Sequence, residues 1–156
     1  MKEALSRVWR AIIEFELIEA NDRILIGLSG GKDSLLLAYI LSVLRRHSPR
    51  PFTVGAFTID TRFGEEFPRP ALQDFCDRLE IPFDSTTVDI PRAIAVSASQ
   101  DACATCAFFR RGALNRVARE RGYNKVALAH HHDDAVETFM MSLFYSGRLK
   151  TFLPKT

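Results

Sequence analysis

The stretch ILIGLSGGKDSLLLAYILSVL, residues 24–44, joins a short apolar run, a glycine turn and a longer apolar segment. The continuous apolar run at 24–28 is typical of a strand that is covered on both faces of a parallel sheet. A helix is predicted from about residue 32 to residue 46, and Pro49 marks its end. A strand, a tight turn and a helix in this order predict the first unit of an α/β domain.

Strands and helices alternate along the rest of the chain. Apolar residues at helical spacing predict an amphipathic helix over 3–20. The other expected elements are strands at 52–60, 82–88 and 126–129, and helices that begin near Pro70, span 106–121 and end at Gly147. The more polar run at 82–88 suits a sheet edge. We therefore predict an α/β fold, a three-layer α/β/α arrangement with a mostly parallel twisted sheet, preceded by an N-terminal helix.

The predicted organisation is an N-terminal helix over 1–22 and one domain over 23–156, because 156 residues suffice for a single domain. Polar or irregular connections are expected at 61–68 and 89–102. A further strand is expected after the last helix, but the sequence ends at Thr156. We therefore expect a domain that is truncated at its C-terminus.

The composition excludes several classes of protein. With 21 Lys+Arg against 19 Asp+Glu, a net charge of +2 and 47% hydrophobic residues, the chain is not disordered. Three cysteines are too few for a disulfide-stapled scaffold, and their odd number, without an apolar signal segment, favours the cytoplasm. The longest apolar stretch, 35–44, is about half of the ~20 residues that cross a bilayer, so no membrane partner is expected.

The hexamer SGGKDS, residues 29–34, carries the residue types that a phosphate site requires. Glycines let the backbone approach an anion, and the N–H groups of the first helical turn point toward it. Lys32 adds a positive charge, and the serines add hydroxyl donors. A Gly-Gly turn with a serine cap is the simpler alternative. The hexamer is not a Walker A loop, because Asp33 follows the lysine and the G-x-x-x-x-G-K spacing is absent.

This hexamer, placed after a strand, resembles the PP-loop of the N-type ATP pyrophosphatases. The resemblance implies an adenine nucleotide alpha hydrolase-like fold and an enzyme that splits ATP between the α- and β-phosphates and transfers AMP to a substrate oxygen. It implies catalytic roles for Lys32, toward the leaving pyrophosphate, and for Asp33, toward Mg²⁺ or orientation. The residues expected to contact ATP are Ser29, Gly30, Gly31, Lys32, Asp33 and Ser34, together with Asp60 at the end of the second strand.

A second motif, AHHHDDAVET at residues 129–138, opens the last helix. It places imidazoles and carboxylates at the carboxyl end of a strand, where open α/β sheets bind ligands. The motif resembles the GHHxDDxxET segment of the tRNA-modifying PP-loop enzymes, with alanine replacing the usual glycine. His130 and His131 are candidate nucleotide contacts, and either Asp133 or Asp134 is expected to bind Mg²⁺ or orient the substrate. Helix capping explains the two acids but not three adjacent histidines.

A third motif is the CxxC pair Cys103 and Cys106. A lone CxxC is compatible with zinc, redox or iron–sulfur chemistry. The two thiols are expected near a helix N-terminus with arginines close by, which lowers thiol pKa values. Cys76 shares a helical stripe with Leu72 and Phe75, so we predict that it is a buried core thiol.

Three motifs in this order resemble the tRNA 2-thiocytidine synthetases, from about Ile24 onward. The resemblance implies that Cys103 and Cys106 ligate a [4Fe-4S] cluster, with a third cysteine completing the set. It further implies that ATP adenylates the C2 oxygen of an anticodon-loop cytidine and that sulfur then displaces AMP. The implied partners are tRNA and a cysteine desulfurase-type sulfur donor. No cysteine follows Cys106, so the third ligand has no counterpart in these 156 residues, and we interpret the chain as an N-terminal portion.

Other interpretations stay open from the residues alone. They are an ATP- or AMP-binding module, an adenylating ligase of the lysidine synthetase type with another acceptor, and a zinc or redox CxxC protein. Arg110 and Arg111 are candidate RNA contacts, although a solvated helix face is the simpler explanation. Of the neighbouring Phe108 and Phe109, at least one is expected in the core. The apolar face of the N-terminal helix favours a homodimer.

Overall fold

The computed structural model describes residues 2–61, 67–89 and 102–152, and the side chains of 102–105 lie outside this description. The chain divides into two compact units, each of which is considered by itself. One unit spans Glu19–Leu128, and the other combines Met1–Ile18 with Ala129–Thr156. Most of the connections predicted at 61–68 and 89–102 fall outside the described residues.

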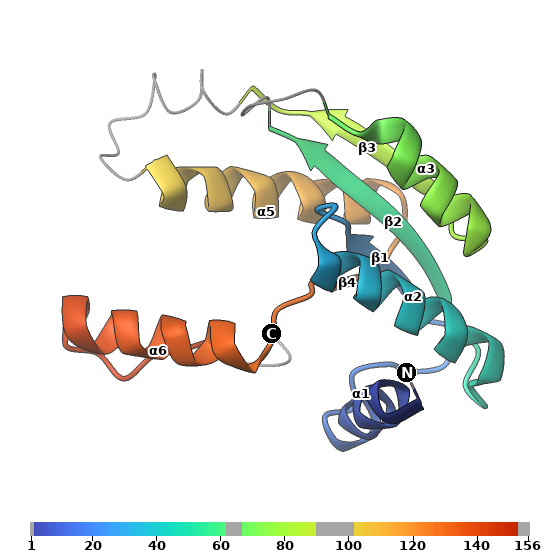
Figure 1. The fold of residues 1–156 in the computed structure, drawn as a ribbon, viewed down its shortest axis with the longest axis horizontal. Coiled ribbons are helices and arrows are strands. Elements are labelled where there is room, and N and C mark those ends of the chain that lie inside the picture. Colours follow the sequence, from blue (N-terminus) through green and yellow to red (C-terminus); the bar gives the residue numbers. More distant parts are fainter. Residues whose placement is uncertain (1, 62–66, 90–101, 153–156) are drawn as a thin grey trace. The chain divides into compact units, whose positions relative to one another are not determined.

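The first unit is built on a four-stranded parallel sheet (Figure 1). Its strands are β1 (Arg23–Gly27), β2 (Thr53–Asp60), β3 (Phe83–Thr87) and β4 (Lys125–Ala127), in the spatial order β3-β2-β1-β4. The three central residues of β1 are buried, as its apolar run predicted. The polar strand β3 lies at an edge, which confirms the predicted α/β class and edge assignment.

Three described helices accompany this sheet: α2 (Lys32–His47), α3 (Arg69–Arg78) and α5 (Ala102–Glu120). Helix α2 contacts β1 and β2, α3 contacts β3, and α5 contacts β2 and β4. Leu25 and Phe57 form a core cluster with Leu114, Val117 and Ala118 of α5. Ile24 and Ile26, which alternate with Leu25 along β1, are equally buried. Apolar burial on both faces of the strand is what the three-layer arrangement requires.

The second unit contains α1 (Lys2–Glu14) and α6 (His132–Ser146). Helix α1 ends six residues before the predicted position, since the backbone takes a left-handed conformation at Glu16, with φ of 50°. Helix α6 ends at Gly147, as predicted, with φ of 60°. Its apolar side chains are not buried, and Phe144 is 77% exposed. No described helix is long and apolar enough to cross a membrane.

A buried carboxylate, which sequence patterns did not reveal, fixes the start of β1. Asp22 is 4% exposed and accepts hydrogen bonds from the Glu19 N–H at 2.6 Å and the Asn124 amide at 2.7 Å. The Lys125 Nζ lies 2.7 Å from the Asp22 Oδ2. Burial opposes ionisation, but these donors outweigh it and hold the pKa of Asp22 below its ordinary value.

We expect Asp22→Asn to destabilise the protein by about 1–3 kcal/mol at neutral pH, because a buried charge-assisted network is broken. Since the folded pKa of Asp22 lies below its unfolded value, its contribution is present above about pH 4 and is lost as the pH falls through the folded pKa. Denaturant titrations at several pH values measure this. The exposed Asp74→Asn is the control. An acid limb that is as steep in Asp22→Asn as in the parent would contradict the assignment.

Candidate functional site

The SGGKDS loop begins where β1 ends and is fastened to the neighbouring strand. The Leu28 N–H donates to the Phe57 carbonyl at 2.9 Å, and the Thr58 hydroxyl donates to the Leu28 carbonyl at 2.5 Å. Gly30 then adopts φ of +83°, which residues other than glycine adopt rarely. The loop is therefore held at the carboxyl edge of the parallel sheet, the usual ligand-binding edge of such folds.

The hydroxyl of Ser34 lies at the centre of the loop's hydrogen bonds. It donates to the Gly31 carbonyl at 2.9 Å and accepts from the Ser29 N–H at 3.2 Å. The Ser29 Oγ lies 3.1 Å from the Ser34 Oγ and accepts from the Gly31 N–H at 3.3 Å. Ser34 is only 4% exposed. The Ser34 hydroxyl proton thus forms a hydrogen bond within the loop.

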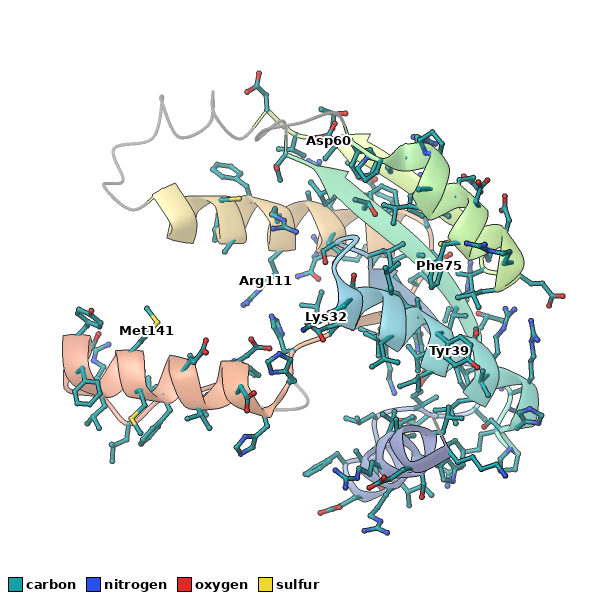
Figure 2. The ribbon with its side chains drawn as sticks, in the orientation of Figure 1. Lys32, Tyr39, Asp60, Phe75, Arg111 and Met141 are labelled. Carbon is teal, nitrogen blue, oxygen red and sulfur yellow. The ribbon has the colours of Figure 1, made fainter. Side chains whose placement is uncertain are left out.

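The N-terminus of α2 supplies the charged groups of the site. The first helical hydrogen bond runs from the Leu35 N–H to the Gly31 carbonyl, so the N–H groups of residues 32–34 precede the helical ladder. The Lys32 Nζ lies 2.9 Å from the Asp33 Oδ2, and 85% of the Lys32 side chain is exposed. Figure 2 shows Lys32 at the start of α2 and Asp60 at the end of β2. Lys32 and Asp33 thus lie at a helix N-terminus that suits an anion, and Asp60 lies at the same carboxyl edge of the sheet.

The histidine motif belongs to the other unit, at the start of α6. The His131 N–H donates to the Asp134 Oδ2 at 2.7 Å, so Asp134 caps the helix. Asp133 differs, because its side chain is 80% exposed and its ion-pair partner among the described residues is the His132 Nδ1, at 3.5 Å. Capping thus accounts for one of the two acids, and the other is available to solvent.

Residues 151 and 152, which follow α6 in the chain, contact His130 and the first turn of α6. The Phe152 ring lies 5.0 Å from the His130 ring, between centroids, with 40° between the ring planes. The Thr151 hydroxyl donates to the Ala135 carbonyl at 2.8 Å, which holds this segment along α6. The structure therefore assembles the loop with Asp60 in one unit, and His130, His131, Asp133 and Asp134 in the other.

The CxxC pair lies inside α5, which starts four residues before the predicted position. Cys106 is partly exposed and is not in a disulfide, whereas the side chain of Cys103 is outside the described residues. Cys76 is 0% exposed, and burial raises its pKa to about 11, which confirms the predicted core thiol. Among the described side chains, no group of three or more histidines, cysteines and acids could hold a metal ion.

Phe108 and Phe109 lie on the surface, so the prediction that at least one packs in the core is wrong. Phe108 is 75% exposed and Phe109 38% exposed. The reason is position along the helix, since every residue from 107 to 112 is exposed and the buried residues of α5 begin only at Ala113. Arg110 and Arg111 are exposed beside the two rings.

The fold and loop define a class of protein: a parallel α/β domain with an anion site at a strand–loop–helix junction. The protein family described as a PP-loop domain matches residues 2–152, and the chain belongs to this family. Its expected adenine nucleotide alpha hydrolase-like fold is thereby confirmed.

Several curated relatives carry the name tRNA-cytidine(32) 2-sulfurtransferase. The protein from Xanthomonas oryzae pv. oryzae is 39% identical over 156 residues, covering 99% of this chain and 51% of that protein. The protein from Bordetella petrii is 40% identical over 148 residues, covering 94% and 45%. The resemblance to 2-thiocytidine enzymes is thus confirmed, and the chain spans about half the length of the curated relatives it matches.

Solved structures show the same fold. The U34-tRNA thiolase NcsA from Methanococcus maripaludis, solved with its [4Fe-4S] cluster, has a TM-score of 0.75 and 25% identity, covering 94% of this chain and 50% of that one. The NH3-dependent NAD synthetase from Campylobacter jejuni has a TM-score of 0.62 and 16% identity, covering 89% and 59%. The second likeness concerns the fold alone.

Proposed function

We propose that this chain is the ATP-binding and adenylating part of a tRNA 2-thiolation enzyme of the 2-thiocytidine type. ATP would activate a tRNA base, sulfur would then be transferred to it, and AMP and pyrophosphate would be released. The observation that carries the proposal is the SGGKDS loop, which is fastened to β2 and places Lys32 and three helix N–H groups at the carboxyl edge of the sheet. The names of the curated relatives support the tRNA substrate.

In the adenylation step, the C2 oxygen of the base attacks the α-phosphorus of ATP, and the bond to the β-phosphate oxygen breaks. The N–H groups of Gly30 and the first turn of α2 are suited to bind the phosphate oxygens, and the Gly31 N–H would join them once the Ser29 hydroxyl that accepts from it turns away. Lys32 would stabilise the charge that develops on pyrophosphate as it leaves. Asp33 faces Lys32 and would orient it or bind Mg²⁺.

The two serines of the loop, Ser29 and Ser34, have different proposed roles. Because the Ser34 hydroxyl is used within the loop, we assign it the task of holding the backbone in the phosphate-binding shape. Ser29 bridges Ser34 and the Gly31 N–H and is the serine placed to turn toward a phosphate. Ser34 would then contact ATP through its backbone N–H.

We expect Ser34→Ala to weaken ATP binding about 10-fold, a change of ~1.4 kcal/mol, because the loop loses its central acceptor and donor. Ser42→Ala is the matched control, since Ser42 is equally buried in the same helix and donates only to the Tyr39 carbonyl at 2.7 Å. Titration calorimetry with ATP measures both variants. Equal ATP affinities in the two variants would refute the role of Ser34.

The proposal also assigns the acids and histidines of the second unit. Since Asp134 caps α6 and Asp133 is 80% exposed, Asp133 is the better candidate for Mg²⁺ or substrate orientation. Hard oxygen ligands and a bound phosphate suit Mg²⁺. His130, held by Phe152, and His131 remain proposed nucleotide contacts.

The cluster ligands fit the proposal in part. Cys103 and Cys106 would supply two thiolates to a [4Fe-4S] cluster, which when bound would supply the sulfur that displaces AMP. Cys76 is unsuited, because it is fully buried and its pKa of about 11 keeps the thiol protonated. The remaining ligand would therefore come from outside these 156 residues. A cysteine desulfurase-type donor, a homodimer and a cytoplasmic location belong to the same proposal.

Mass spectrometry of nucleosides from tRNA incubated anaerobically with the protein, ATP and a sulfide source tests this function. The expected result is ATP-dependent replacement of a cytidine oxygen by sulfur. Formation of AMP with a base that gains another group instead would establish the adenylating ligase alternative.

A further inference from the structure

We infer that the exposed first turns of α5, residues 107–112 and here named the α5 tip, form a stacking platform for an unpaired RNA base, with Phe108 as its aromatic surface. The inference rests on the proposed tRNA function and names the surface that would hold the substrate. It concerns the sheet unit alone, to which the whole of α5 belongs.

The α5 tip does not take part in the core of its unit. Every residue from Ala107 to Gly112 is exposed, whereas Leu114 and Val117, further along the same helix, are 6% and 7% exposed. Phe108 leaves 75% of its surface in solvent. Phe108 and Phe109 are exposed next to each other, and a contiguous exposed aromatic patch is typical of an interaction site.

The ring of Phe108 contacts one neighbouring ring and is otherwise largely exposed to solvent. It meets Phe109 edge to face, with centroids 5.8 Å apart and 80° between planes. Such a contact covers at most one face of a ring, so a face of Phe108 is left for a planar partner. Four residues on, Gly112 occupies the same side of the helix, and a Cβ built there meets no atom within 4 Å. The helix surface at Gly112, one turn from Phe108, therefore carries no side chain and has room for an added group.

The positive charge around the Phe108 ring favours a nucleic acid as the binding partner. Arg110 and Arg111 are exposed, neither forms an ion pair with a described residue, and Arg111 projects from α5 in Figure 2. The sequence of α5 contains no acid before Glu120. An aromatic face beside guanidinium groups matches single-stranded RNA, whose bases stack on phenylalanine while arginines bind phosphates. A duplex hides its bases in the stack, so the platform distinguishes unpaired from paired RNA.

Binding of two labelled RNAs tests the platform: a hairpin with an unpaired loop, and a blunt duplex of the same charge. We expect Phe108→Ala to weaken hairpin binding about 5- to 100-fold and to leave duplex binding unchanged. Phe108→Trp should restore hairpin binding, because indole stacks at least as well. Arg111→Gln should weaken both RNAs and lower the salt dependence by about one phosphate contact. Phe15→Ala, which removes another exposed aromatic, is the matched control.

The outcomes separate this inference from the proposed function. The platform would be refuted if Phe108→Ala left hairpin binding unchanged, or if it weakened hairpin and duplex binding equally. In either case, tRNA-dependent AMP formation would still support the proposed function. Selective loss of hairpin binding in a protein that forms no AMP with tRNA would support the platform and refute the function. Thermal unfolding verifies each variant's fold, which an exposed side chain should not affect.

Discussion

Replacing Lys32 with alanine should lower the rate of AMP formation by about 10²–10³-fold, the usual cost of removing one group that stabilises developing charge. Lys32 is the one cation of the loop, at the N-terminus of α2. Its side chain is 85% exposed and pairs only with Asp33 among the described residues. The change in folding stability should therefore stay within about 0.5 kcal/mol.

Rates of AMP release from ATP with tRNA and a sulfide source measure this effect, and the loss should fall on kcat more than on KM. Lys32→Arg keeps the charge and should recover part of the rate. Arg46→Ala, which removes a cation at the opposite end of α2, is the matched control. A Lys32→Ala protein with the parent rate would eliminate Lys32 from the chemistry.

A large loss of folding stability is expected from Gly55→Ala, in the middle of β2. A Cβ built on Gly55 overlaps the Tyr123 hydroxyl and lies 2.8 Å from the Tyr123 Cζ. The Tyr123 ring cannot easily retreat, since it packs against the core cluster of Leu25 and Phe57 and lies 5.4 Å from the Arg23 guanidinium carbon. We expect a loss of about 1–3 kcal/mol, the usual cost of overpacking.

Gly112→Ala should act in the opposite direction. The added methyl group meets no atom within 4 Å, and alanine is the better helix former by about 1 kcal/mol. Thermal unfolding of both variants measures the difference, and Gly55→Ala combined with Tyr123→Phe should recover part of the loss. Equal melting temperatures for the two glycine variants would show that Tyr123 does not confine Gly55.

The strand–loop–helix unit at 24–44 could be predicted because its signals are local. An apolar run, two glycines and an amphiphilic helix specify their own conformations, and β1 and α2 follow them closely. The edge position of β3 followed from its polar composition in the same way. The core thiol Cys76 could be predicted from the apolar helical stripe to which it belongs, because such a stripe indicates burial.

Features that depend on tertiary contacts were not visible in the sequence. The point along α5 at which packing against the sheet begins decides that Leu114 is buried and Phe108 is not, and no local sequence pattern shows that point. The left-handed backbone at Glu16 ends α1 earlier than predicted, and no glycine in the sequence marks this position. The separate roles of Asp133 and Asp134 rest on one hydrogen bond to the His131 N–H.

The products formed from ATP decide whether this chain adenylates a tRNA base. ATP labelled in the α-phosphate would be incubated with the protein, Mg²⁺, tRNA and a sulfide source, and the products separated. We expect labelled AMP and an equal amount of pyrophosphate, both dependent on tRNA and both lost in Lys32→Ala. Labelled ADP with inorganic phosphate would contradict it, because cleavage would then occur at the bond that a PP-loop enzyme leaves intact.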